Sequence, residues 1–444
     1  MPLADGFLLV DADGRFARLS WDDGDDALTV TPLSLRVPTN FDQFDADAPP
    51  AAMRRHFRVA DLVVQDVADR VRVLVSHHFW HGDRGCWVVR VSEATLSRDS
   101  LTVGSPEWRT LFEAKPCLPM RRGIRAPPFQ GLEMGGAMVL IDRTHLLVAL
   151  GDQGFDGVND ELAVSQDPAA DYGKTVLIDL DNGKVEHFSS GHRNPQGLVL
   201  DASGTIWLTE HGPQGGDELN RIERGGNYGW PLVTFGTQYT APWPSSRTPG
   251  EHTGFHLPTF TWTPSIGPSS VIEAGSQSVP GWEHDLIVAA LSGMRLSRVR
   301  VRDSRVIYVE PIPTGLTIRD VAQGAGGRIV LWNDEGVVVS VRPARQERSG
   351  ARLFGLCSAC HPVGGDRDQS RGPDLIGVFQ RYVAAAPGFD FSPALKSAGG
   401  KWTEARLSEF LRDPQAFASG TTMQFAGMPD ENERSMLIAH LRRF

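Results

Sequence analysis

Short apolar runs separated by turn residues fill the chain from its start to residue 343. Segments such as LLVDADGRFARL, VLIDLDNGKVEHF, LVLDASGTIWLTE and DVAQGAGGRIVLW each place two such runs around an Asp, Asn or Gly turn, as a β-hairpin does. Hairpins repeated over this length would leave many open edges in a flat sheet, whereas radially arranged blades protect their edges. The pattern predicts an all-β six-bladed propeller over residues 1–343, at ~50 residues per blade. We expect its first run, GFLLVDADGRFARL, to pair with the last blade and close the ring.

The pattern changes after the propeller. The charged stretch RPARQERSGARLFG predicts a linker over residues 344–352 that leads into a helix. TEARLSEFLRD and ERSMLIAHLRRF then carry apolar residues at spacings of three and four, which is typical of amphipathic helices. Residues 353–444 are therefore expected to form a small all-α domain that needs a bound group to be stable.

Composition narrows the partners and the location. The chain has 444 residues, 47 glycines, 30 prolines and a net charge of -10, which fits a turn-rich acidic surface and argues against nucleic acid as a partner. It contains no apolar run near the ~20 residues of a membrane helix, so no membrane span is expected. Because Met1-Pro2 leads directly into a strand-like run, we expect any export signal to lie outside this chain.

The four cysteines divide into two kinds. Cys357, Cys360 and His361 form C-x-x-C-H, in which two thiols add to the vinyl groups of one haem while the imidazole reaches the iron. We therefore expect one covalent haem c and a periplasmic or other extracytoplasmic location, which is oxidising. Cys86 and Cys117 could then form a disulfide or remain as two buried thiols, and the sequence leaves both open.

Residues 353–444 resemble the class I cytochromes c. GPDL follows the haem motif, and GTTMQFAG lies where the family has its distal loop. The resemblance implies that Pro373 orients His361 through its carbonyl, and that Arg381 and Trp402 bind a haem propionate. It favours Met423 as the second iron ligand, with Met428 as the competing thioether.

The segment GHRNPQGLVLDASGTIWLTEHGPQGGDELNRIERGGNYGWP is the most specific part of the propeller. With MGGAMVLIDRTHLLVALGDQG, WTPSIGPSS and TIRDVAQGAGGRIVLWNDEG, it closely resembles the soluble glucose dehydrogenase and aldose sugar dehydrogenase family. These are six-bladed propellers that use pyrroloquinoline quinone (PQQ) with calcium. A tricarboxylate quinone needs fixed cations, and the resemblance assigns Arg193, Asn194 and Arg319 to it.

The same resemblance predicts two calcium sites. The carbonyls of Gly212 and Pro213 would bind the cofactor-bridging calcium, because backbone oxygens in a turn are suitable hard ligands. Asp217, Glu218 and Tyr228 would belong to a second, structural calcium. Taken one at a time, an arginine in a surface ion pair or an Asp-Glu pair on a solvated loop explains such residues equally well.

Two features depart from the family. A family histidine accepts the sugar hydroxyl proton, and Glu133 stands in its place, so Glu133 is the candidate general base. Thr317 replaces a family arginine, and LSGMRL lacks a matching lysine, so fewer cations would hold the quinone.

The sequence therefore predicts a quinohaemoprotein, a PQQ-dependent dehydrogenase that oxidises a sugar, polyol or related alcohol. Electrons would pass to the fused haem and then to a downstream acceptor. The alternative is a PQQ-free propeller that binds carbohydrate or a partner protein, with the cytochrome as the only redox centre.

Overall fold

The computed structural model describes residues 2–3, 6–21, 28–68, 70–97, 107–121, 127–157, 163–237, 251–341, 350–358, 360–364 and 371–444, without the side chains of Ala325 and Arg352. The chain divides into two compact units, Met1–Pro343 and Ala344–Phe444. Each unit is described by itself. Residues 344–349 of the predicted linker, 344–352, lie outside the described residues.

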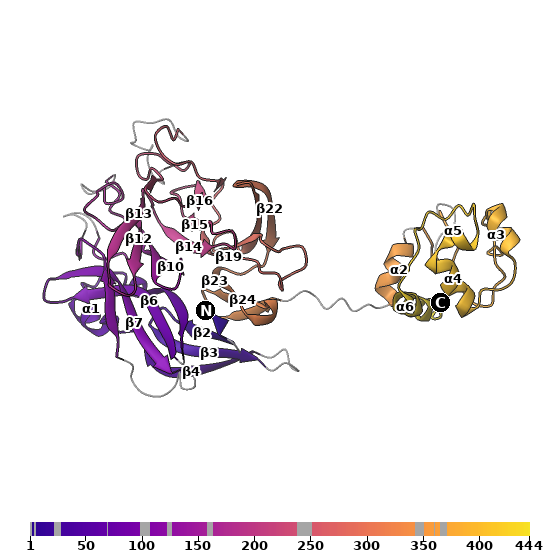
Figure 1. Cartoon of the computed structure of the whole chain (residues 1–444), viewed down its shortest axis with the longest axis horizontal. Coiled ribbons are helices and arrows are strands. Elements are labelled where there is room, and N and C mark those ends of the chain that lie inside the picture. Colours follow the sequence, from indigo (N-terminus) through magenta and orange to yellow (C-terminus); the bar gives the residue numbers. More distant parts are fainter. Residues whose placement is uncertain are drawn as a thin grey trace. The chain divides into compact units, whose positions relative to one another are not determined.

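Six antiparallel sheets build the first unit and follow one another in chain order around it (Figure 1). The first sheet contains β1 (Pro2–Leu3), β2 (Gly6–Val10), β3 (Arg15–Trp21) and β4 (Leu28–Arg36). The second contains β5 (Val59–Val67), β6 (Arg70–His81), β7 (Cys86–Ser97), β8 (Arg109–Glu113) and β9 (Leu118–Pro119). The third contains β10 (Gly135–Leu140), β11 (His145–Leu150), β12 (Lys174–Asp179), β13 (Val185–Ser190) and β17 (Gly226–Asn227), which pairs parallel to β13. The fourth sheet contains β14 (Pro195–Leu200), β15 (Ile206–Glu210), β16 (Asp217–Arg221) and β18 (Phe260–Trp262). The fifth contains β19 (Pro268–Glu273), β20 (Leu286–Ala290), β21 (Arg295–Arg302) and β22 (Arg305–Pro313). The sixth contains β23 (Ile318–Gln323), β24 (Ile329–Asn333) and β25 (Val338–Val341). The predicted six-bladed propeller is confirmed.

Apolar residues fill the spaces between neighbouring sheets. One such cluster joins the first and last sheets, with Phe7 and Leu19 packed on Val330. The expectation that the first run pairs with the last blade is wrong, because β2 hydrogen-bonds to β1 and β3 in a sheet of its own. The two sheets meet through buried side chains instead.

The innermost strands share an irregularity. β5, β10, β14, β19 and β23 contact one another in turn, and each shows a register shift against its second strand close to its own start. Such bulges bend a strand and re-aim side chains. In a propeller, equivalent strand starts lie at one end of the central channel, and we call this end the channel mouth.

Cys86 and Cys117 form a disulfide with a Cα–Cα distance of 5.7 Å. Cys86 begins β7, and Cys117 directly precedes β9, which pairs with the same end of β7. The bridge therefore ties the short strand β9 to its sheet. Outside the sheets, the propeller unit also has α1 (Phe41–Asp47) and the 3₁₀ turns η1 (Arg54–His56) and η3 (Ala325–Gly327).

The second unit is helical, with α2 (Gly350–Ser358), α3 (Pro393–Ala398), α4 (Glu404–Arg412), α5 (Pro414–Phe417) and α6 (Glu431–Leu441). The side chains of Thr403 and Asp430 cap the starts of α4 and α6, where the sequence pattern predicts helices. α2 begins at Gly350, within the segment expected to be linker. In the described part of the chain, no helix is long and apolar enough to cross a bilayer.

Candidate cofactor and catalytic site

Glu133 and Arg193 meet at the channel mouth. Glu133 lies two residues before β10 and Arg193 two residues before β14, in neighbouring sheets. A nitrogen of the Arg193 guanidinium donates a charge-assisted hydrogen bond to the Glu133 carboxylate. Both side chains are mostly buried, with 20% of Glu133 and 13% of Arg193 exposed. The predicted base and the predicted cofactor cation thus neutralise each other.

The Glu133 backbone has an uncommon conformation. Its φ is 57°, in the left-handed region that non-glycine residues rarely adopt. The Gln153 N–H donates to its carbonyl over 3.2 Å, and Gln153 has a similar φ of 59°. Gly151 makes this approach possible, because a Cβ there would overlap the Glu133 carbonyl. Such enforced conformations are found preferentially at functional sites.

Asp152 lies behind this ion pair and is fully buried. Its carboxylate accepts hydrogen bonds from the Trp230 indole N–H at 2.6 Å and from the Gly154 N–H at 2.8 Å. Burial and then the charge of Glu133 raise the pKa of Asp152 well above its usual value. Trp230 also lies beside the Arg193 guanidinium, 5.3 Å from its ring centroid, so Arg193 is held between an aromatic ring and acidic groups.

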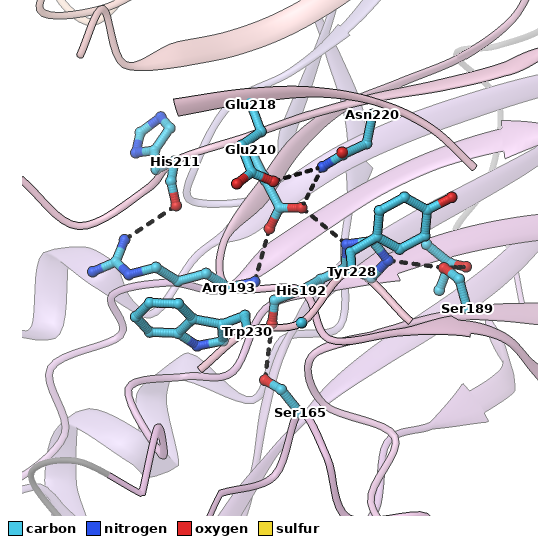
Figure 2. A network of polar contacts seen from close by, with 12 residues as sticks. Ser165, Ser189, His192, Arg193, Glu210, His211, Glu218, Asn220, Tyr228 and Trp230 are labelled. Carbon is cyan, nitrogen blue, oxygen red and sulfur yellow. Dashed lines mark hydrogen bonds and ion pairs between the residues drawn. The ribbon is translucent and has the colours of Figure 1, made fainter. Parts of the chain in front are cut away.

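Glu210 organises a buried network under Arg193 (Figure 2). Its carboxylate accepts from the Arg193 backbone N–H at 2.8 Å and the Asn220 amide at 3.0 Å, and it contacts His192 Nδ1 at 2.9 Å. His192 continues the network to Ser189 Oγ at 2.8 Å. This network fixes the backbone that carries Arg193 and was not foreseen, although GHRN and EHGP were both noticed as motifs.

A second carboxylate shares that network. Glu218 Oε2 accepts from the Asn220 amide at 3.0 Å, so one amide bridges Glu218 and Glu210. Burial and then the Glu210 charge raise the pKa of Glu218 to about 8. The Asn220 side-chain oxygen is buried with no hydrogen-bond partner in the described structure. Two buried carboxylates beside an unsatisfied oxygen form a donor set suited to calcium.

The carboxylate of Asp217 makes different contacts from that of Glu218, the next residue in the sequence. Its carboxylate accepts from the backbone N–H groups of Gly212, Ile266 and Gly267 at 2.8–3.0 Å and from Ser265 Oγ at 3.0 Å. Asp217 thus clamps the EHGP turn to the segment before β19. The structure does not bring its carboxylate to that of Glu218.

The remaining calcium candidates are spread around this turn. The Gly212 carbonyl accepts from Arg193 Nη1 at 2.9 Å, and its second lone pair can still bind a metal. Pro213 follows it in the turn. The Tyr228 hydroxyl donates to the Arg221 carbonyl, while its ring stacks on His192 at 4.9 Å. The Tyr228 hydroxyl is therefore engaged with the backbone. In the described residues, no three His, Cys, Asp or Glu side chains gather as a metal centre.

Arg319 lies at the register shift of β23. Its guanidinium donates to Asp334 Oδ1 at 2.8 and 2.6 Å, and 41% of the side chain is exposed. Burial lowers the pKa of His211, and the charges of Arg193 and Arg319 lower it further, so both arginines act on one imidazole at the mouth. Asn194 is buried and accepts from the Gln196 side chain at 2.8 Å.

The structure adds one arginine that the sequence analysis missed. Arg58 directly precedes β5, and burial and then the charge of Arg319 lower its pKa to about 10. A lone arginine before a strand carries no motif, and only the position of β5 in the ring shows that it lies at the mouth.

In the helical unit, the haem motif is arranged around His361. His361 Nδ1 lies 2.9 Å from the Pro373 carbonyl, the contact that the resemblance predicts. A Cβ on Gly372 would come within 2.6 Å of the imidazole, so only glycine fits there. Cys357 is partly buried and Cys360 exposed, both as free thiols. The Arg381 guanidinium donates to the Asp374 carbonyl at 2.8 Å, and Trp402 is buried against Phe410.

The two candidate methionines differ in burial. Met428 is 4% exposed and part of the helical core, and its N–H donates to the Leu411 carbonyl at 2.7 Å. Met423 is partly buried at the edge of that core. Met428 is therefore a core residue, whereas Met423 packs against the edge of the core.

A six-bladed propeller with an arginine-lined mouth, joined to a helical unit with a C-x-x-C-H motif, defines a class of modular redox protein. The family model described as Glucose / Sorbosone dehydrogenase matches residues 62–339. The chain belongs to this family, and its C-terminal part is homologous to cytochromes c.

Individual relatives agree with this assignment. Aldose sugar dehydrogenase YliI of Escherichia coli is 31% identical over 295 residues, covering 64% of this chain and 76% of the relative. A Synechocystis sp. protein, named only as uncharacterized, is 30% identical over 275 residues, covering 57% of this chain and 63% of its own length. Cytochrome c2 of Blastochloris viridis is 40% identical over 110 residues, covering 24% of this chain and 87% of its own.

Solved structures share the propeller fold. The apo-form of the soluble aldose sugar dehydrogenase from Escherichia coli superposes with a TM-score of 0.60 and 26% identity, covering 77% of this chain and 93% of that one. The PQQ-bound aldose sugar dehydrogenase from Streptomyces coelicolor superposes with a TM-score of 0.51 and 19% identity, covering 77% of this chain and 99% of that one.

Proposed function

We propose that this chain is an extracytoplasmic quinohaemoprotein, in which the propeller oxidises a sugar or polyol and the fused cytochrome unit carries the electrons away. One observation carries the proposal: a propeller of the Glucose / Sorbosone dehydrogenase family and a cytochrome c homologue lie on the same chain. Fusion replaces collision between two proteins by a high effective concentration. When bound, the quinone would supply a two-electron acceptor and the haem a one-electron carrier.

The residues of the mouth fit such a cofactor. Arg193 and Arg319 would pair with its carboxylates, and Asn194 would add an amide. The Gly212 and Pro213 carbonyls would hold the calcium beside it, while Glu218 and Tyr228, with Asp217 as a clamp on the turn, would support the structural calcium. A protein with the same propeller fold has been solved in a PQQ-bound form.

Glu133 would act as the general base. Oxidation of an alcohol requires a group that accepts the hydroxyl proton, and a carboxylate at the channel mouth meets that requirement. The hydrogen bond from Arg193 orients the Glu133 carboxylate. Buried Asp152 behind it favours its protonated form, which limits the negative charge at this point.

The helical unit fits a covalent haem. Cys357 and Cys360 would attach it, His361 and Met423 would ligate the iron, and Pro373 would orient the imidazole. Arg381 and Trp402 would contact a propionate. Met428 belongs to the core, which supports Met423 as the ligand.

The test is a spectrum. The haem-loaded protein is reconstituted with PQQ and calcium, a panel of aldoses and polyols is added, and the reduced haem bands are followed. Reduction by one substrate class, dependent on PQQ, supports the proposal. If no substrate reduces the haem although the quinone is bound, the chain is not a dehydrogenase of these substrates.

A second candidate is a PQQ-free propeller that binds carbohydrate or a partner protein. The ion pairs Arg193–Glu133 and Arg319–Asp334 favour it, because they neutralise the two predicted cofactor cations within the protein. Calorimetry that detects sugar binding but no PQQ binding would support this alternative.

A further inference from the structure

Arg58 occupies a repeated position of the propeller. It directly precedes the register shift of β5, as Asn194 directly precedes that of β14. Glu133 lies two residues before the shift of β10, and Arg319 lies within the shift of β23. Because these shifts recur at the starts of inner strands that contact one another in turn, Arg58 belongs to the channel mouth with the proposed site residues.

The backbone of Arg58 is fixed on both sides by His78. The Arg58 N–H donates to His78 Nδ1 at 3.2 Å, and the Arg58 carbonyl accepts from the His78 N–H at 3.0 Å. The His78 ring is fully buried, with Phe57, Trp87 and Phe129 at centroid distances of 5.2–5.5 Å. Burial lowers the pKa of His78 well below its usual value, so the ring is neutral and can accept this bond. Arg58 is thus held at the mouth by a rigid aromatic support.

The guanidinium of Arg58 has no hydrogen-bonded partner among the described residues, although the charge of Asp334 acts on it. In the described structure, no carboxylate or carbonyl accepts a hydrogen bond from it, whereas Arg193 and Arg319 are each paired with an acidic residue. Arg58 is partly exposed as a residue. Burial and then the charge of Arg319 disfavour this cation, and the charge of Asp334 offsets them only in part, because the pKa of Arg58 remains lowered. A bound carboxylate would offset that cost.

We propose that Arg58 binds a carboxylate group of a ligand at the channel mouth, carried either by the quinone cofactor or by a sugar-acid substrate. The inference rests on the proposed function for the identity of these two ligands. A guanidinium binds a carboxylate through two parallel hydrogen bonds, which gives orientation as well as affinity.

The test uses direct binding rather than turnover. PQQ with calcium, D-glucuronate and D-glucose are each titrated into the full haem-loaded chain by calorimetry, with wild type, Arg58→Gln, Arg58→Lys and Arg55→Gln. Arg55 is exposed and three residues away, so its variant removes the same charge without touching the mouth. Arg58→Lys keeps the charge but loses the two-pronged geometry. Melting temperatures confirm that all variants are folded.

Arg58→Gln is expected to lower the affinity for the carboxylate ligand by about 10- to 100-fold. Arg58→Lys should lower it by less, and Arg55→Gln hardly at all. Weakened PQQ binding assigns the carboxylate to the cofactor, and weakened glucuronate binding with unchanged PQQ binding assigns it to the substrate. If Arg58→Gln binds both as tightly as wild type, or if wild type binds neither, the inference is overturned. If binding depends on Arg58 but no sugar reduces the haem, the proposed function fails while the role of Arg58 stands.

Discussion

Arg193 donates a charge-assisted hydrogen bond to Glu133, across 60 positions of sequence and between two neighbouring sheets. The pair joins a candidate cofactor cation to the candidate base. Because of this pairing, Arg193 presents less positive charge to an anionic ligand than an unpaired arginine would. In the proposed function, this contact would couple catalysis to cofactor binding.

Glu133→Gln should separate the two roles. The amide keeps the shape but cannot accept the proton, so turnover should fall by ~10²-fold or more. PQQ should bind as well or better, because Arg193 is no longer neutralised. Steady-state haem reduction and calorimetric PQQ titration measure the two effects. Asp334→Asn is the matched control, since it releases Arg319 in the same way but leaves the base in place. Unchanged turnover in Glu133→Gln would place the base elsewhere.

Calcium removal should destabilise the propeller. The structural calcium proposed at Glu218 would bind the folded state only, which adds about 2.7 kcal/mol when its concentration is 100 times the dissociation constant. A chelator should therefore lower the melting temperature of the propeller transition in calorimetry. Glu218→Gln should abolish this effect, whereas Glu223→Gln, at an exposed ion pair with Arg221, should preserve it. The calcium assignment fails if chelation leaves melting unaltered and elemental analysis finds no metal.

Acid should weaken the propeller through His77. This imidazole is fully buried, between Ser92 Oγ and the His78 carbonyl at 2.8 Å each, and burial lowers its pKa to about 4. Between pH 6.5 and about 4 the unfolded chain binds a proton that the folded chain does not, so the free energy of unfolding falls as the pH falls.

The expected loss is on the order of 3 kcal/mol over this window. Urea unfolding at several pH values, followed by tryptophan fluorescence, should show that His77→Gln has a flatter pH profile than wild type. His256→Gln, at an exposed position, serves as the control and should keep the wild-type profile. Equal slopes in wild type and His77→Gln would contradict the prediction.

The two methionines should give opposite phenotypes. Met423→Ala should remove the methionine-to-iron charge-transfer band and lower the reduction potential, with little effect on folding. Met428→Ala should keep the band and the potential but destabilise the helical unit by about 2–5 kcal/mol, because it empties a core position. Absorption spectra and denaturant titrations measure both. Loss of the band in Met428→Ala alone would make Met428 the ligand.

The propeller could be predicted because each hairpin carries its own signal. Alternating runs around Asp, Asn and Gly turns specify a hairpin locally, and their number sets the number of blades. The pairing of the first strand could not be predicted in the same way. Phe7 and Leu19 bury their side chains against Val330 of the last sheet without exchanging backbone hydrogen bonds, and hydrophobicity alone does not distinguish packing from pairing.

The candidate site was predicted as residues but not as contacts. Glu133, Arg193 and Arg319 were found through their motifs, while their pairing depends on the distances between blades, which no local pattern encodes. Asp217 and Glu218 are adjacent in the sequence, yet one clamps a turn and the other joins Glu210, because successive residues of a strand point to opposite faces. Arg58 was not predicted either, because no local sequence pattern shows which residues of different blades lie close together.

Because each blade has its own register shift, the residues at the channel mouth can change independently of one another. Each inner strand presents its side chain from its own bulge, so a substitution in one blade leaves the backbone of the other blades in place. A glutamate at position 133 or an arginine before β5 can thus be accommodated without redesign of the fold. The mouth is thus lined by residues that can be varied one blade at a time, and new substrate preferences in this chain can be sought in this way.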